Sequence, residues 1–185
     1  MKLSKIGALC RAVKRFIIYR TRRGEQWLSD GYAIFPLRDM PRLEPDNVFL
    51  IFDVPEEKRG KMLFDEKDEL PCGLDLSEDT EDKFPLHPVP MAIGYRGAVL
   101  YPYFVGSRII FIDKKYLDCF EGGIELFERK FTDGRSYIVV KKGFFIEGAL
   151  MAAEVACAEL ADNLSDMGEA VARQIQPEEL DTSDI

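Results

Sequence analysis

The chain offers few residues whose type and spacing point to catalysis. Its single histidine, His87, lies in the proline-rich run Phe-Pro-Leu-His-Pro-Val-Pro without a partnered Cys or Ser motif, so a structural role is expected. The four cysteines are scattered and form no C-x-x-C pair, which indicates reduced thiols in a cytoplasmic protein rather than a zinc site or a disulfide framework. No glycine-rich phosphate-binding motif is present. We therefore predict a protein that is not an enzyme and has no cofactor or metal.

Carboxylates are concentrated in the middle of the chain. Residues 53–83 contain twelve acids against five bases. A carboxyl group acquires a shifted pKa through burial or a close like charge, and runs of charge are usually solvated. The sequence therefore predicts a long charged insertion at about 55–90, with a weak divalent-cation site as a minor alternative.

Basic residues are concentrated at the N-terminus, although the formal net charge of the chain is −8. Residues 1–23 contain eight basic residues and no acid. Apolar residues at helical spacing predict a helix over 3–16, with Arg11 and Arg15 on its exposed face and Lys14 at the edge. Such a face suits a phosphate backbone, a membrane surface or plain solvent. No apolar stretch is long enough to span a membrane, so no membrane partner is expected.

The remaining pattern predicts an α+β protein. A strand over 16–19 and a hairpin around Ser29-Asp30-Gly31 follow the first helix. The apolar run 47–54 is expected to be a buried central strand. Further strands are predicted over 91–95, 98–105, 108–113, 124–130, 136–141 and 144–151, with two helical turns over 114–120. The domain plan is a folded unit over 1–152, a C-terminal helix over 153–173 and a disordered acidic tail over 174–185.

Two stretches of the chain show a faint internal repeat. In each, a turn glycine precedes an aromatic residue by three positions, as Gly24 precedes Trp27 and Gly134 precedes Tyr137. A second glycine then precedes an aromatic and an isoleucine: Gly31, Tyr32 and Ile34 in the first copy, Gly143, Phe144 and Ile146 in the second. The fold class expected is therefore α+β, with antiparallel sheets built from two pseudo-repeated β-α-β-β-β units.

Two such units in tandem build each domain of the DNA polymerase sliding clamps, and this chain resembles one such domain. Ser29-Asp30-Gly31 resembles the Thr-Asp-Gly turn of clamp domains, and residues 112–117 (Ile-Asp-Lys-Lys-Tyr-Leu) resemble the stretch where a clamp strand enters its second helix. The resemblance implies that both helices line a DNA-facing side. The residues placed there are Lys5, Arg11, Lys14, Arg15, Lys114 and Lys115.

The resemblance leads to a functional expectation. Basic helices would hold DNA, or a DNA-replication or DNA-processing protein, and would contact phosphates without reading sequence. A full clamp ring needs six such domains, so the oligomeric state stays open. Small acidic proteins of this kind are common in prophages and mobile elements, which is the origin expected. The alternative is a protein-interaction or inhibitor module, unrelated to DNA, that docks through the acidic segment 56–83.

Overall fold

The computed structural model describes residues 1–154 of the 185-residue chain. The predicted acidic tail, and all but the first two residues of the predicted C-terminal helix, lie outside the described residues. Residues 1–154 contain four helices and eleven strands. In chain order these are α1 (Leu3–Val13), β1 (Arg15–Arg20), β2 (Gln26–Ser29), β3 (Ala33–Pro36), α2 (Pro45–Ile51), α3 (Glu56–Arg59), β4 (Leu63–Lys67), β5 (His87–Pro88), β6 (Ile93–Tyr95), β7 (Ala98–Val105), β8 (Arg108–Asp113), α4 (Lys114–Leu117), β9 (Glu125–Lys130), β10 (Ser136–Lys142) and β11 (Phe145–Leu150).

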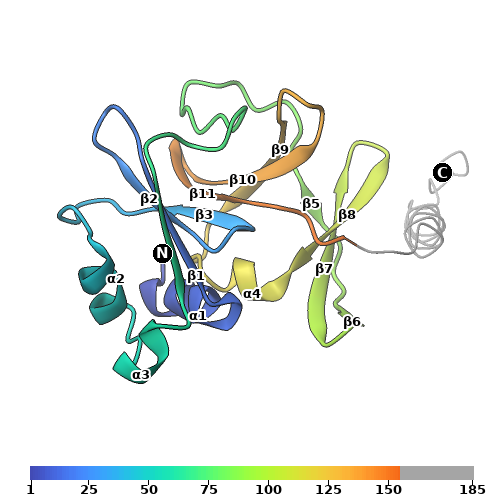
Figure 1. Ribbon diagram of the computed structural model, residues 1–185. Coiled ribbons are helices and arrows are strands. Elements are labelled where there is room, and N and C mark those ends of the chain that lie inside the picture. The colour runs from blue at the N-terminus through green and yellow to red at the C-terminus, as the bar shows by residue number, and fades with distance from the viewer. Residues whose placement is uncertain (155–185) are drawn as a thin grey trace, which may run out of the picture.

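A seven-stranded sheet in the order β4-β1-β2-β3-β11-β10-β9 forms the body of the protein (Figure 1). Two antiparallel meanders, β1-β2-β3 and β9-β10-β11, meet through β3 and β11 at the middle of this sheet. The junction is short: Ile34 pairs with Ala149 and Ala33 pairs with Leu150. At Gly148 an added Cβ would lie 2.7 Å from the backbone oxygen of Ile34, so the close approach of the two strands requires glycine.

The two meanders carry matching turns. Thr21 donates its backbone N–H to the carbonyl of Glu25 at 3.0 Å, and Phe131 donates to Arg135 at 2.8 Å. Trp27 and Tyr137 are each the second residue of the strand that follows the turn, and both belong to the same buried cluster. Trp27 and Tyr137 therefore follow similar turns at Gly24 and Gly134.

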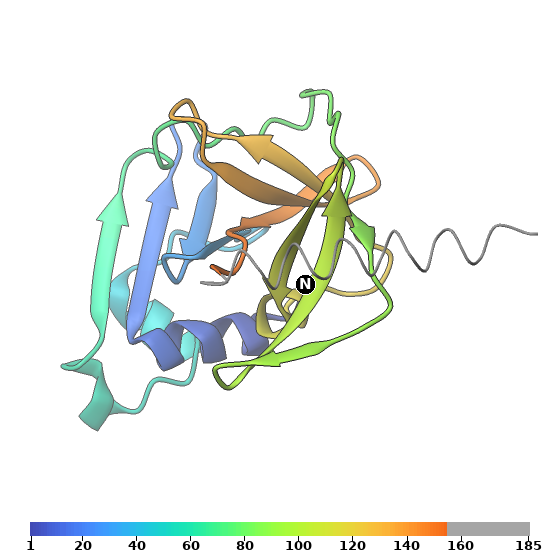
Figure 2. The same cartoon turned by 90° about the vertical axis from the view of Figure 1, so that its right-hand side faces the viewer.

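The two faces of this sheet are covered differently. Helices α1, α2 and α4 pack on one face, where Ile6, Phe35 and Tyr116 belong to the larger core. Figures 1 and 2 show α1 and α4 side by side below the sheet, while the chain that follows β4 crosses above it. We call residues 70–82 of this crossing chain the strap. Its leucines cover the smaller buried cluster around Trp27 and Tyr137.

A second, smaller sheet packs against the helix side of the core. Strand β7 is its centre and pairs antiparallel with β8 along one edge and with β5 and β6 along the other. Residues of β7 and β8, including Val105 and Ile112, belong to the larger core, so the two sheets form one folded body. The α+β class is confirmed. In the part of the chain that the structure describes, no helix is long and apolar enough to cross a membrane.

The prediction of a buried central strand over 47–54 was wrong. Residues Pro45–Ile51 form α2, with Pro45 in the first turn, where its missing N–H has no helical partner to lose. Val48, Phe49 and Phe52 are buried at helical spacing, while Leu50 and Ile51 are exposed. A run that is apolar at every position fits a buried strand as well as a short helix, and the proline at its start was the signal in favour of a helix.

A second difference concerns β4. The sequence predicted a charged insertion at about 55–90 without a strand, but Leu63–Lys67 pairs in parallel with β1 at the edge of the large sheet. The sheet is therefore mixed rather than purely antiparallel. The connection from β3 to β4 runs through α2 and α3, which supplies the length that a parallel crossover requires.

A buried carboxyl group ties the two meanders to the helix side. One oxygen of Asp30 accepts hydrogen bonds from the backbone N–H groups of Tyr32 and Ala33, each at 2.9 Å. The other oxygen accepts the hydroxyl of Tyr116 in α4 at 3.1 Å. Burial, followed by the nearby Asp30, raises the pKa of Tyr116 above its ordinary value of 10.0, so this hydroxyl keeps its proton and remains a donor.

We expect Tyr116→Phe to lower the free energy of unfolding by about 1–3 kcal/mol, because one oxygen of the buried Asp30 would lose its only donor among residues 1–154. Urea unfolding of the purified variant measures this change. Tyr32→Phe is the matched control, since the Tyr32 side chain lies beside the same turn but is 59% exposed, and its loss should change the stability by less than about 0.5 kcal/mol. Equal effects of the two substitutions would contradict the role given to the Asp30 hydrogen bond.

Candidate nucleic-acid interface

The concave surface that contains predicted site residues lies along the outer side of α1. We define the α1 groove by its lining residues, Ala8, Arg11, Ala12, Lys14, Asp53, Pro55, Lys58 and Met62, which enclose about 540 Å³. Three cations and one carboxylate line it. Ala8 and Ala12 are exposed and small, so they keep the middle of the helix face open to a bulky partner.

Arg11 and Lys14 reach the groove by different routes. The guanidinium of Arg11 donates to the backbone oxygen of Phe52, which holds the side chain across the gap between α1 and the chain after α2. Lys14 ends the helix in a left-handed conformation (φ 56°), and its carbonyl accepts the N–H of Leu63 at 2.9 Å. Neither cation forms an ion pair with a carboxylate among residues 1–154.

Lys58 completes the groove from α3, and the sequence analysis did not single it out. It too lacks an ion-pair partner within the described part of the chain. Its local sequence, Glu56-Glu57-Lys58-Arg59, reads as a mixed surface turn. Lys58 and Lys14 line the same groove only through the tertiary arrangement of α3 and α1, so no sequence signal could have paired them.

A second group of cations lies at the other end of α1, and nearby carboxylates neutralise more of its charge. The ammonium of Lys114 lies 2.6 Å from the carboxylate of Asp118. The hydrogen bond from Lys114, with Lys5 and Lys2 nearby, lowers the pKa of Asp118 below its ordinary value of 3.8. The structure therefore places Lys5 and Lys114 near one carboxylate, Asp118, which reduces their joint charge.

The two remaining predicted residues are placed differently. Lys115 pairs with Asp113 at 3.0 Å and lies over the ring of Tyr116. Arg15 does not belong to the helix, because α1 ends at Val13 and Arg15 begins β1. Strand alternation places it with Tyr19 on the strap side of the sheet, where it pairs with Asp65 at 3.2 Å. The expectation that Arg15 shares the exposed face of the first helix was therefore wrong.

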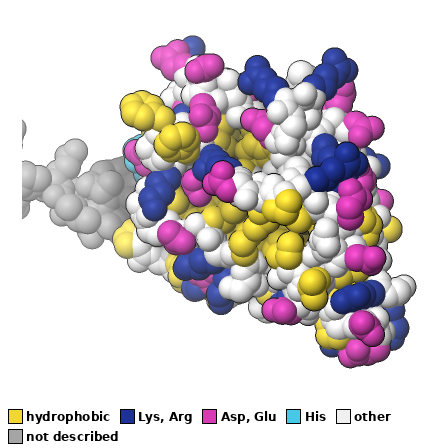
Figure 3. Space-filling model, turned by 90° about the vertical axis from the view of Figure 1, so that its left-hand side faces the viewer, with side chains coloured by type: hydrophobic (Ala, Val, Ile, Leu, Met, Phe, Trp, Pro, Cys, Tyr) yellow, Lys and Arg dark blue, Asp and Glu magenta, His cyan; other side chains and the backbone are white. Residues whose placement is uncertain are grey.

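The side of the molecule that carries α2 and α3 is not uniformly basic. Figure 3 shows side chains of both charges around an apolar area at the centre of this side. Leu50 and Ile51 of α2 and Leu63 of β4 are among the exposed apolar residues. The exposed cations on this side are thus interspersed with carboxylates and do not form one broad basic face.

Many carboxylates of the acidic segment form ion pairs with arginines and lysines of this chain. Asp65 pairs with Arg15, Glu66 with Arg20, and Glu69 with Arg22. In the strap, the carboxylate of Asp82 forms ion pairs with Arg129 at 2.7 Å and Lys141 at 2.9 Å. All three side chains are nearly buried. The hydroxyl of Tyr137 donates to the carbonyl of Asp75 at 3.1 Å and accepts its N–H at 3.0 Å. Residues 70–82 of the charged insertion predicted at about 55–90 are therefore a folded cover for the sheet rather than a solvated run.

The chemistry-bearing residues considered first in the sequence do not converge. His87 is exposed in β5, opposite Phe104 of β7. Cys10 and Cys119 are buried thiols, and burial raises the pKa of Cys119 to about 12, while Cys72 is exposed. Within residues 1–154, no group of three or more His, Cys, Asp and Glu side chains is arranged to hold a metal ion. Cys157 lies outside the described residues.

Comparison with known proteins adds no family. No protein-family model, no curated protein and no solved structure matches this chain. The likeness to sliding-clamp domains therefore stays a hypothesis based on the residues and the element order.

We expect Asp82→Asn to lower the free energy of unfolding by about 3 kcal/mol at neutral pH, because Arg129 and Lys141 would lose their shared carboxylate in a buried setting. Asp79→Asn is the control, since Asp79 is an exposed carboxylate of the same strap. Chemical unfolding curves over a range of pH measure both variants.

The pH dependence should identify the cause. Burial raises the pKa of Asp82, but the hydrogen bonds from Arg129 and Lys141 outweigh it and hold the pKa below its ordinary value of 3.8. The folded carboxylate thus binds a proton less tightly than the unfolded one. Its stabilisation is complete above pH 3.8 and is lost as the pH falls through the lower, folded-state pKa. The gap between wild type and Asp82→Asn should close in strong acid, and a gap independent of pH would refute this account.

Proposed function

We propose that this protein is a non-catalytic binding protein that associates with DNA through the phosphate backbone, using the α1 groove as its contact surface. The observation that carries the proposal is the groove itself: Arg11, Lys14 and Lys58 line one concavity against a single carboxylate, Asp53. Elsewhere on the described chain, many cations are already paired with carboxylates. A cationic groove in an acidic protein suits a polyanion that is drawn to one site and repelled by the rest of the surface.

The length of the α1 groove fits a phosphate backbone. From Ala8 to Lys14 the groove follows six residues of chain, which is about 9 Å along a helix axis. Duplex DNA presents about five phosphate charges over that length. The small side chains of Ala8 and Ala12 would allow close approach. Such contacts fix position on DNA and do not read its sequence.

The clamp-like part of the proposal is supported by correspondence between the meanders. We propose that α1-β1-β2-β3 and α4-β9-β10-β11 are pseudo-repeats, since their turns, aromatic positions and helix side agree. The parallel strand β4 and the helix α2 depart from a clamp domain. A DNA-replication or DNA-processing protein as partner, a ring and a prophage origin remain predictions.

The alternative of docking through 56–83 also remains a prediction, but the structure changes how it must be tested. Shortening the segment would remove β4 and the strap and would expose the cluster around Trp27, so loss of a partner would be ambiguous. Neutralising the exposed carboxylates of Asp79 and Glu81 leaves the strap in place over the sheet. It therefore tests whether the acidic segment binds a partner.

The test of DNA binding is fluorescence anisotropy of a labelled duplex in a salt series. Wild type should bind with a Kd of about 1–100 μM at moderate salt, weakening steeply as salt increases. Lys14→Ala with Lys58→Ala should weaken binding to any sequence equally and reduce the slope of log K against log salt by about two.

The matched control replaces Lys130 and Lys142, two exposed cations at the ends of β9 and β10, by alanine. This variant carries the same net charge as the groove variant, and its salt slope should equal that of wild type. Equal losses in both variants, or no binding by wild type at low salt, would reject the α1 groove as a DNA site.

A further inference from the structure

The smaller sheet presents an apolar face on the side away from the larger core. Alternation along β7 turns Tyr103 and Val105 toward that core. Five apolar residues of β7 and β8 point to the opposite side: Leu100, Pro102, Phe104, Ile109 and Phe111. We call these five residues the outer face. Figure 1 shows β7 and β8 along one side of the described body.

Two residues of the outer face are buried. Leu100 and Phe111 are each only 3% exposed, yet neither belongs to either of the two buried clusters within residues 1–154. The packing of these two cores therefore does not account for their burial. An apolar sheet face becomes stable when another element of structure packs on it and excludes water.

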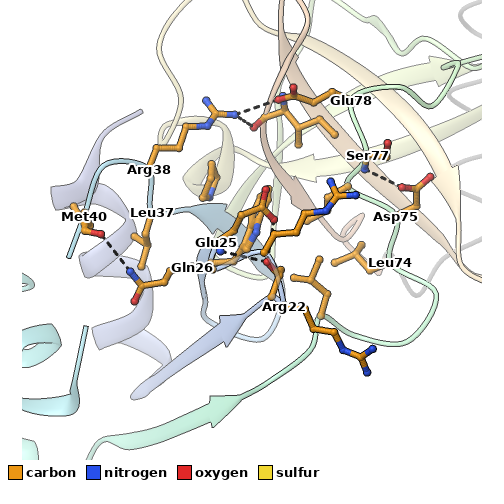
Figure 4. A pocket seen from close by; sticks show the side chains of 18 of the residues that line it. Arg22, Glu25, Gln26, Leu37, Arg38, Met40, Leu74, Asp75, Ser77 and Glu78 are labelled. Atoms are coloured by element: carbon orange, nitrogen blue, oxygen red, sulfur yellow. Dashed lines mark hydrogen bonds and ion pairs between the residues drawn. The ribbon is translucent and has the colours of Figure 1, made fainter. Parts of the chain in front are cut away.

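The outer face differs in kind from the hollow on the strap side. That hollow, of about 900 Å³, is bordered by charged side chains of both signs, among them Arg22, Arg38 and Glu78 (Figure 4). Water solvates a lining of this kind. The outer face consists of apolar side chains alone, so it requires a cover.

The described chain ends beside the outer face. The backbone N–H of Ala153 donates to the carbonyl of Phe111 in β8 at 2.7 Å. Residues 155–173, which we call the C-terminal segment, follow directly. As a helix this segment would be about 28 Å long, and β7 with its eight residues spans about 26 Å. The C-terminal segment therefore starts at the outer face and is long enough to cover it.

The sequence of the C-terminal segment contains one apolar stripe. Apolar residues recur in alternating steps of three and four: Cys157, Leu160, Leu164, Met167 and Val171. Charged residues recur with the same steps, out of phase with the apolar ones: Glu159, Asp162, Asp166, Glu169 and Arg173. This spacing predicts an amphipathic helix with one face to bury and one face for water.

We propose that the C-terminal segment forms this helix and docks on the outer face of its own molecule, with the apolar stripe against Ile109 and Phe111. The charged stripe then points to solvent, and Ala153 anchors the helix to β8. The outer face is closed to other proteins for as long as the helix stays docked. This surface is distinct from the α1 groove, because no residue of the outer face lines that groove.

Cys157 lies on the apolar stripe, so its thiol reports whether the stripe is covered. The full-length protein is treated with iodoacetamide for increasing times, and each cysteine is followed by the mass of its peptide. Each rate is divided by the rate of the same cysteine in urea. By this ratio Cys157 should react at least about tenfold more slowly than the exposed Cys72. Equal ratios would overturn the proposal.

Substitutions on both sides of the contact locate it. Ile109→Asp places a charge in the outer face and Leu164→Asp places one in the stripe, so each should speed alkylation of Cys157 by about tenfold or more. Val99→Asp is the matched control, because Val99 points to the opposite side of β7 and is 43% exposed. It should leave the rate within about twofold of wild type.

The buried thiols of Cys10 and Cys119 should stay protected in all three variants, which shows that the body remains folded. A rate for Cys157 that neither Ile109→Asp nor Leu164→Asp changes would overturn the proposal. Protection of Cys157 should also be the same over a hundredfold range of protein concentration. Protection that is lost on dilution would instead assign the outer face to a second copy of this chain.

Discussion

The carboxyl group of Asp30 is the interaction on which the arrangement of the two halves depends. One oxygen fixes the backbone of Tyr32 and Ala33, and these are the residues that meet β11: Tyr32 accepts the N–H of Met151, and Ala33 pairs with Leu150. The other oxygen holds Tyr116, whose helix leads into the second meander. A single buried group thus sets the start of β3, the seam of the sheet and the position of α4. Such a fully bonded polar group specifies one packing more sharply than apolar contacts alone.

The two sides of the large sheet differ in how far their charged side chains form ion pairs. On the strap side, acidic residues of the middle segment meet arginines and lysines of the sheet, and the most buried group, Asp82 with Arg129 and Lys141, closes the cover. On the helix side, the cations near the end of α1 lack such partners within the described chain. The net charge of the protein therefore does not predict the charge of either surface, because the fold pairs acids with bases on one side and leaves cations unpaired on the other.

The sequence predicted the class of the fold and the strands of both meanders, because Gly31 and Gly143 mark turns between strongly apolar runs and tertiary packing did not override them. It could not separate helix from strand at 47–54, where the five residues 48–52 are all apolar. It also could not show that Leu70, Leu74 and Leu76 cover a sheet, because they are dispersed among charges. Of the candidate site, Arg11 and Lys14 were predictable from helical spacing. Lys58 was not, because its place in the groove depends on how the fold arranges α3 beside α1.

The seam between β3 and β11 has a consequence for synthesis of the chain. The first meander leaves the ribosome early, with Ile34 and Phe35 on an edge strand whose partner, Phe145–Leu150, lies near the end of the described chain. Until that partner emerges, β3 presents unpaired backbone groups and apolar side chains, which readily accept a foreign strand. Contacts this distant in sequence also form slowly. The large sheet is thus complete only after β11 has emerged, and chains interrupted before β11 are the ones exposed to aggregation.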